Sequence, residues 1–102
     1  MIVRMWHGKV PNNKAAAYRS FLSARAIPDY KSVEGNISVH VLERMEGEVT
    51  HFVTLTFWRS LEDIKRFAGQ DVERAKYYDE DKDYLIEFEP NVVHYQVVGN
   101  SS

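Results

Sequence analysis

The side chains best suited to chemistry are four histidines, a group of aromatic residues and two threonines on one predicted strand. The histidines are His7, His40, His51 and His94. A neutral imidazole can accept a proton or bind a metal ion near neutral pH. No two histidines have the short spacing that brings a pair together on one strand or helix. We therefore favour hydrogen-bonded histidines at an interface or rim over a metal-binding cluster of histidines. We keep His7 as a candidate general base.

These groups must be positioned by the stretch His51–Trp58, whose aromatic and β-branched residues predict a strand. Alternate side chains of a strand point to opposite faces, and neither face of this one is polar. One face carries Phe52, Thr54, Thr56 and Trp58, and the other carries His51, Val53, Leu55 and Phe57. A strand with one solvent-exposed face would carry polar residues along that face. We therefore expect helices to cover one face and a second copy of the chain to cover the other.

The remaining elements predict a ferredoxin-like βαββαβ fold of the α+β class. The predicted strands are Ile2–Lys9, Asn36–Arg44, Val49–Trp58 and Val92–Val98, and the predicted helices are Lys14–Ile27 and Leu61–Ala68. Pro28 should end the first helix, and Ser60 and Gly69 should cap the second. A further short helix is expected from Val72 to Tyr78, before an exposed acidic run at Asp79–Asp83.

Short connections then favour an antiparallel sheet in the order 4-1-3-2, with both helices on one face. The phase of the first strand is expected to bring His7 near Trp58. Two copies that pair through the other face of the sheet would form a dimeric α+β barrel. We expect residues 1–98 to form this single domain and residues 99–102 to be a flexible tail.

Composition narrows the class of protein. The 102 residues include no cysteine, which excludes disulfides and thiolate chemistry. A net charge of −2 without a basic stripe argues against nucleic-acid binding. No apolar run reaches the length of a membrane span, and the N-terminus lacks a signal-peptide pattern. We expect a soluble, cytoplasmic protein.

Several segments resemble the antibiotic biosynthesis monooxygenase (ABM) family. They are Met5–Gly8, Phe57–Ile64, Phe67–Gly69, Phe88–Pro90 and His94–Val98. The resemblance implies a homodimer with a pocket between sheet and helices in each protomer. Characterised members of the family include cofactor-independent oxygenases of aromatic polyketides, haem-degrading enzymes and quinol oxygenases. Trp58 matches a tryptophan that lines the pocket in the polyketide and haem branches.

The resemblance to the haem branch is incomplete. That branch has a haem-ligating histidine after an alanine beyond the second helix, and the matching pair here is Ala75-Lys76. The first strand also lacks the asparagine that the branch uses. We therefore expect no haem, and neither a metal nor an organic cofactor.

These observations lead to two hypotheses. In the first, the protein is a cofactor-independent monooxygenase of a planar aromatic or quinol-type small molecule. His7 would be the base, Trp58 the stacking wall, and Thr54 and Tyr78 the hydrogen-bonding groups. In the second, the protein is a non-catalytic small-molecule-binding or stress-response dimer of the same fold, because the same aromatic residues can form an ordinary core and threonine is common in strands.

Overall fold

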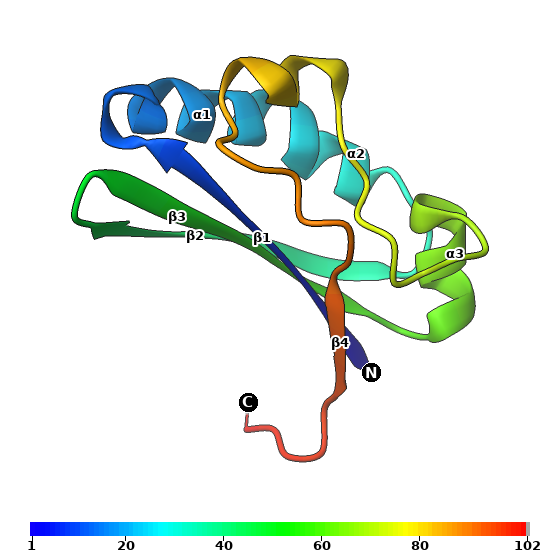
Figure 1. Cartoon of the computed structure of the whole chain (residues 1–102). Coiled ribbons are helices and arrows are strands. Elements are labelled where there is room, and N and C mark those ends of the chain that lie inside the picture. Colours follow the sequence, from blue (N-terminus) through cyan, green and yellow to red (C-terminus); the bar gives the residue numbers. More distant parts are fainter. Residues whose placement is uncertain (102) are drawn as a thin grey trace.

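The structure, a computed structural model, describes residues 1–101 and has two layers, a sheet and the helices that cover one of its faces (Figure 1). The strands are β1 (Ile2–Pro11), β2 (Asn36–Glu46), β3 (Val49–Trp58) and β4 (Val93–Gln96). The helices are α1 (Ala15–Phe21), α2 (Ile27–Lys31) and α3 (Leu61–Ala68), with the short helical turns η1 (Asn12–Lys14), η2 (Leu22–Ala26) and η3 (Asp79–Asp83). All strand pairs are antiparallel, in the order β2-β3-β1-β4. This confirms the predicted ferredoxin-like α+β fold and its sheet order.

The first helical layer is longer than predicted, because η1, α1, η2 and α2 follow one another from Asn12 to Lys31. The prediction that Pro28 ends this helix is wrong. The turn η2 is π-helical, and the N–H of Ile27 donates to the carbonyl of Leu22, five residues back. The hydrogen-bond pattern is therefore already offset where Pro28 has no N–H to donate, and the helix continues far enough to bury Tyr30.

The register of β1 on β3 decides which side chains face the helices. Ile2 pairs with Trp58, Trp6 with Thr54 and His7 with Val53. Paired residues of an antiparallel ladder point to the same face. Trp6, Thr54 and Trp58 therefore face the helices, whereas His7 points to the opposite face of the sheet.

The chain after α3 differs most from the prediction. Ser60 caps α3 by accepting a hydrogen bond from the backbone N–H of Asp63, and Gly69 ends the helix at φ 90°, both as predicted. The helix expected from Val72 to Tyr78 is wrong, because this part of the chain is non-helical. Its backbone instead bonds the segment before β4, through Ala75 N to Pro90 O at 2.9 Å and Val92 N to Glu73 O at 2.7 Å.

The acidic run at Asp79–Asp83 is not wholly exposed as expected. It forms η3, and the carboxylate of Asp81 is buried, where it accepts hydrogen bonds from the hydroxyl of Tyr18 and the N–H of Tyr78. The strand β4, at Val93–Gln96, is shorter than predicted. The chain between α3 and β4 thus runs back over the helical side of the sheet (Figure 1).

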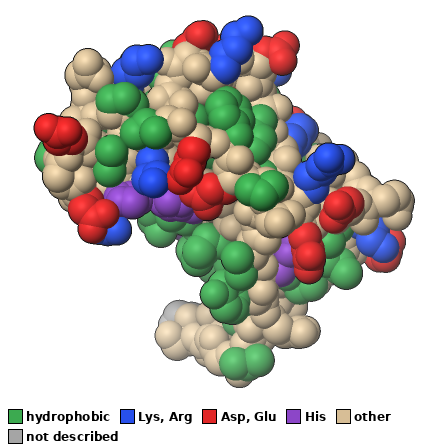
Figure 2. Space-filling view, viewed as in Figure 1, with side chains coloured by type: hydrophobic (Ala, Val, Ile, Leu, Met, Phe, Trp, Pro, Cys, Tyr) green, Lys and Arg blue, Asp and Glu red, His purple; other side chains and the backbone are tan. Residues whose placement is uncertain are grey.

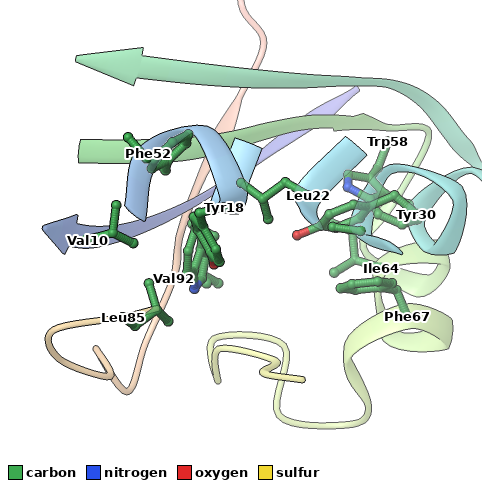
Figure 3. Close-up of a cluster of buried hydrophobic side chains, with 13 residues drawn as sticks. Val10, Tyr18, Leu22, Tyr30, Phe52, Trp58, Ile64, Phe67, Leu85 and Val92 are labelled. Carbon is green, nitrogen blue, oxygen red and sulfur yellow. The ribbon is translucent and has the colours of Figure 1, made fainter. Parts of the chain in front are cut away.

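The core lies between the two layers, and aromatic residues gather at both ends of it (Figure 3). Trp58, Tyr30, Phe67 and Ile64 pack at one end, whereas Phe52, Tyr18, Val10 and Leu85 pack at the other. Within residues 1–101, no helix covers the opposite face of the sheet (Figure 1). That open face carries exposed hydrophobic side chains, including Leu42, Val93 and Tyr95. In the part of the chain that the structure describes, no helix has the length and apolar character needed to cross a membrane.

Candidate functional site

A small hollow lies between the sheet and the helices. Its walls include Trp6, Tyr18, Tyr30, Thr54, Lys76 and Tyr78. The hollow measures about 10 Å³, which is room for about one water molecule. Two of the four predicted site residues, Thr54 and Tyr78, therefore lie together on its wall, and the hollow is closed to anything larger in this conformation.

The hydroxyl of Thr54 is bound within the protein. It lies 3.1 Å from the hydroxyl of Tyr30, and both side chains are buried. Thr56 is satisfied in the same way, because it donates to the carbonyl of Arg4 at 3.2 Å and accepts from the indole N–H of Trp58 at 2.8 Å. The two threonines therefore do not need a ligand or water as a partner.

Tyr78 and Lys76, which both line the hollow, form a hydrogen-bonded group with Asp29, which is not among the lining residues. The Tyr78 hydroxyl donates to Asp29 Oδ2 at 2.5 Å, and Lys76 Nζ lies 3.1 Å from the same oxygen. Burial raises the pKa of the Asp29 carboxyl, but the hydrogen bonds from Tyr78 and Lys76 outweigh burial and lower it below its usual value. Burial, followed by the bond to Asp29, raises the pKa of Tyr78. At neutral pH the group therefore presents an ionised carboxylate beside a neutral phenol.

Trp58 lies behind Tyr30 and does not line the hollow. Its side chain is fully buried, and the Tyr30 ring meets it edge-on at 6.5 Å between ring centroids. Phe67 packs on Trp58 at 5.9 Å and stacks on Tyr30 at 4.4 Å (Figure 3). A ligand would reach the indole of Trp58 only if Tyr30 moved.

The prediction that strand phase brings His7 near Trp58 is wrong. Trp58 pairs with Ile2, five residues before His7 on β1. An odd separation puts the two side chains on opposite faces, roughly 16 Å apart along the strand. His7 therefore belongs to the open face of the sheet.

On that open face, four side chains form a continuous His–Glu chain in the order Glu89, His7, His51, Glu46. His7 Nδ1 lies 2.5 Å from Glu89 Oε2, and His7 Nε2 lies 2.8 Å from His51 Nδ1. His51 Nε2 lies 2.8 Å from Glu46 Oε1. The bond from His51 lowers the pKa of Glu46, with a contribution from Arg44. Figure 2 shows histidine and acidic side chains beside the hydrophobic patch of this face.

A groove of about 280 Å³ runs beside the His–Glu chain, and its walls include His7, Leu42, Arg44, His51 and Val53. The other two histidines lie elsewhere. His40 Nε2 contacts the hydroxyl of Ser38 at 3.2 Å, and His94 faces the helical side. Among residues 1–101, no group of three or more histidine or acidic side chains is arranged to hold a metal ion.

Sequence reasoning missed Asp29, Tyr30 and Glu89. Both Asp29 and Tyr30 fall in the segment that the sequence assigned to a loop after Pro28. The signal that could have found Tyr30 is the four-residue step from Tyr18 through Leu22 and Ala26, which continues the buried stripe of the helix past the proline. Glu89 had no such signal, because a fold-level contact joins it to His7, 82 residues away.

The sequence profile of the family described as antibiotic biosynthesis monooxygenase matches residues 1–76. A search among curated protein sequences returned no match.

Solved structures share the fold at low sequence identity. A Nitrosomonas europaea protein assigned to the antibiotic biosynthesis monooxygenases has a TM-score of 0.71 and 17% identity, with 97% of this chain and 100% of that one covered. A Bacillus cereus protein with the same assignment has a TM-score of 0.67 and 16% identity, covering 99% and 96%. The haem degrader MhuD of Mycobacterium tuberculosis, with two haems bound in its active site, has a TM-score of 0.68 and 16% identity, covering 100% of both chains. At these identities the likeness establishes the fold, while the profile match over three quarters of the sequence establishes that the chain belongs to the antibiotic biosynthesis monooxygenase family.

Proposed function

We propose that the protein is a monooxygenase that oxidises a planar, phenol- or quinol-type small molecule in the hollow, without a metal or organic cofactor. The observation that carries the proposal is the group formed by Tyr78, Asp29 and Lys76, in which the ionised carboxylate of Asp29 is bonded to two residues that line the hollow, Tyr78 and Lys76. A fixed carboxylate beside a neutral phenol can take a proton from a substrate and return it later in the reaction. Membership of the monooxygenase family supports the same reaction class.

The chemistry needs only the substrate and oxygen. An anthrone-type substrate loses a proton to Asp29, directly or through Tyr78, and the resulting carbanion forms a C–O bond with O₂. The peroxide anion takes the proton back to give a hydroperoxide. The O–O bond and the remaining C–H bond of that carbon then break with loss of water, which leaves a carbonyl on the substrate. One oxygen atom enters the product and the other leaves as water, and the substrate supplies all the electrons.

The remaining residues hold the substrate. In this proposal the Thr54 and Tyr30 hydroxyls bond its oxygen atoms, and Trp58 supports the Tyr30 ring from behind. Asp29 takes the role that the sequence suggested for His7, because His7 lies on the other face of the sheet. Since the hollow holds about one water molecule, its wall must move to admit a substrate, and we propose that the moving part is the segment 69–78, which carries the lining residues Lys76 and Tyr78.

The residues present do not fit haem of the kind bound by MhuD. Lys76 stands where the haem branch has its ligating histidine, and its ammonium group lies 3.1 Å from the Asp29 carboxylate and 4.3 Å from the centroid of the Phe67 ring. A protonated amine has no electron pair to give to iron. The proposed reaction therefore runs without haem.

Oxygen uptake with anthrone, corrected for its oxidation in buffer, tests the proposal. Asp29→Asn should lower kcat roughly 10²-fold, which is the usual contribution of a general base. His7→Ala is the matched control and should keep turnover near the native value. Full activity in Asp29→Asn, or loss of activity in His7→Ala alone, would show that the base has been assigned to the wrong face.

We also propose that two copies pair through the open face of the sheet. Support comes from the exposed hydrophobic side chains of this face, of which Leu42 is 48% exposed and Tyr95 57%. Hydrophobic residues gathered on one face of a small protein mark an interaction site. Sedimentation that showed a monomer at micromolar concentration would contradict the homodimer.

A second candidate function is a non-catalytic ligand-binding or stress-response dimer. One observation favours it, namely that the hollow is nearly filled and its threonine is already bound to Tyr30. Ligand binding without any oxygen uptake would support this function over the oxygenase.

A further inference from the structure

Arg4 is buried without an anionic partner. Its side chain is 1% exposed, and its guanidinium donates a hydrogen bond from Nη2 to the carbonyl of Arg74 at 3.0 Å, with the neutral hydroxyl of Tyr30 also near it. Its Nε is buried and has no partner among residues 1–101. Other arginines pair with carboxylates within 4 Å, namely Arg19, Arg44, Arg59 and Arg66. Among residues 1–101, Arg4 has no such pair.

Two more buried nitrogen atoms without partners lie on the same face of the sheet. His94 pairs with Arg4 across β4 and β1, and its Nε2 is buried and unbound. Trp6 follows two residues after Arg4 on the helical side of β1, and its Nε1 is also unbound. The Trp6 indole, however, lies against Gly8 and Tyr77, so we call Arg4 and His94 alone the Arg4 site. Two neighbouring buried nitrogens without partners among residues 1–101 are unusual, since nearly all buried polar atoms in proteins are hydrogen-bonded.

Aromatic rings and a second cation adjoin the Arg4 site. The Arg4 guanidinium carbon lies 5.4 Å from the centroid of the Phe67 ring, and Lys76 Nζ lies 4.3 Å from the same centroid. The positive charge of Lys76 is paired with the carboxylate of Asp29, whereas the positive charge of Arg4 has no carboxylate within 4 Å among residues 1–101. Burial, followed by the charge of Arg4, lowers the pKa of His94, and the acidic group that opposes them is Glu73.

A buried charge of this kind is strongly unfavourable unless an opposite charge or hydrogen bonds compensate it. The Arg74 carbonyl supplies one bond and no charge. It occupies a position where an anionic oxygen would meet the guanidinium, and it belongs to the segment 69–78 that is proposed to move when the hollow opens.

We propose that the Arg4 site binds the carboxylate group of a planar aromatic substrate, which replaces the Arg74 carbonyl as the acceptor. This inference rests on the proposed function, because it places the substrate in the same space between sheet and helices. A guanidinium binds a carboxylate through two parallel hydrogen bonds, and His94, whose Nε2 is buried and unpartnered among residues 1–101, pairs with Arg4 on the same face. The rings of Phe67 and Tyr30 supply a surface for the aromatic part of the substrate.

Two probes that differ only in the carboxylate test the proposal. Titration calorimetry under argon compares 1,4-dihydroxy-2-naphthoate with 1,4-dihydroxynaphthalene. The native protein should bind the carboxylated probe at least tenfold more tightly. Arg4→Met and Arg4→Gln should each bind the two probes equally. Arg19→Met, which removes an exposed arginine on α1, should keep the native preference.

Equal affinity of the two probes for the native protein overturns the proposal without any variant, and so does a preference that survives in Arg4→Gln. Circular dichroism checks that each variant is folded, and Arg4→Gln keeps a polar group if Arg4→Met does not fold. Oxygen uptake separates this inference from the proposed function. A native preference for the carboxylated probe without oxygen uptake supports the Arg4 site and contradicts the oxygenase. Uptake with no preference between the probes supports the oxygenase and contradicts the Arg4 site.

Discussion

The bond between the hydroxyls of Tyr30 and Thr54 should be visible in the free energy of unfolding. The two oxygens lie 3.1 Å apart, and the exposed fractions of the two residues are 6% and 2%. Thr54→Val keeps the side-chain shape but leaves the Tyr30 hydroxyl buried without this partner. Tyr30→Phe leaves the Thr54 hydroxyl in the same position. An unsatisfied buried polar group costs about 1–3 kcal/mol, so each single substitution should destabilise the fold by that amount.

The double variant Tyr30→Phe/Thr54→Val should behave differently from the sum of its parts. It removes both hydroxyls, so no buried polar group loses its partner, and replacing both partners with apolar groups can be nearly neutral. We expect the double variant to be no less stable than the weaker single variant. The coupling free energy from the double-mutant cycle should then be at least as large as the smaller of the two single effects, about 1–3 kcal/mol.

Urea unfolding followed by tryptophan fluorescence measures the cycle. With a urea dependence of roughly 1–3 kcal/mol per molar, a loss of about 2 kcal/mol lowers the midpoint by about 0.7–2 M. Ser20→Ala removes an exposed hydroxyl on α1 and should change stability by less than about 0.5 kcal/mol. Additive single effects would refute the reasoning, because they would mean that the two hydroxyls do not satisfy each other.

Three further substitutions test other parts of the structure. Leu42→Asp puts a charge on the open face and should shift the proposed homodimer to monomer in sedimentation at micromolar concentration. Asp29→Asn should reduce stability at pH 7 but not at pH 2 in urea unfolding. Because the pKa of Asp29 is lower in the folded state than in the unfolded state, its ionised carboxylate stabilises the fold at pH values above the unfolded-state pKa, near 4. This stabilisation is lost as the pH falls through the folded-state pKa. Gly35→Ala should cost more than about 2 kcal/mol in the same assay, because φ is +96° and the new Cβ would collide with the Asp63 side chain.

Matched controls accompany these predictions. Leu61→Asp adds the same charge on α3, outside the open face, and should leave the dimer intact. A dimer that survives Leu42→Asp but not Leu61→Asp would show that the chain pairs elsewhere. Gly47→Ala has a positive φ but open space around the new Cβ, so it should cost only about 1 kcal/mol. Equal losses at the two glycines would rule out the collision with Asp63. If the free energies of unfolding of the native protein and Asp29→Asn differed by the same amount from pH 7 to pH 2, the ionisation of Asp29 would not be the source of this stability.

The fold could be predicted because local signals agreed with the tertiary structure. The alternation of β3 and the caps of α3 at Ser60 and Gly69 depend on residues close in sequence, and each was found where expected. Pro28 misled the prediction, since a π-helical turn before it offsets the hydrogen bonds. The same error hid Asp29 and Tyr30, because the continued helix brings Tyr30 to the wall of the hollow and Asp29 to the hydroxyl of Tyr78.

The site was less predictable, because its contacts join distant residues. The sequence proposed Thr54 and Tyr78, and both line the hollow. It could not determine the register of β1 on β3, and a change of one residue moves every side chain to the other face. His7 was assigned to the wrong face for this reason. The predicted helix near Tyr78 failed because the segment's backbone bonds the chain before β4, which local propensity does not report.

The His–Glu chain on the open face has a fixed proton inventory. Its three contacts involve four ring nitrogens and two carboxylates. If both carboxylates are ionised, each contact needs one proton, so the two rings together hold three. Two neutral imidazole rings would hold only two N–H protons and leave one contact without a proton. Two protonated rings would hold four N–H protons, so that two N–H groups would face each other across the contact between His7 and His51.

The four side chains are therefore fully ordered in one protonation state, with a single imidazolium shared between His7 and His51 and a net charge of −1. Adding or removing one proton breaks one link of the chain.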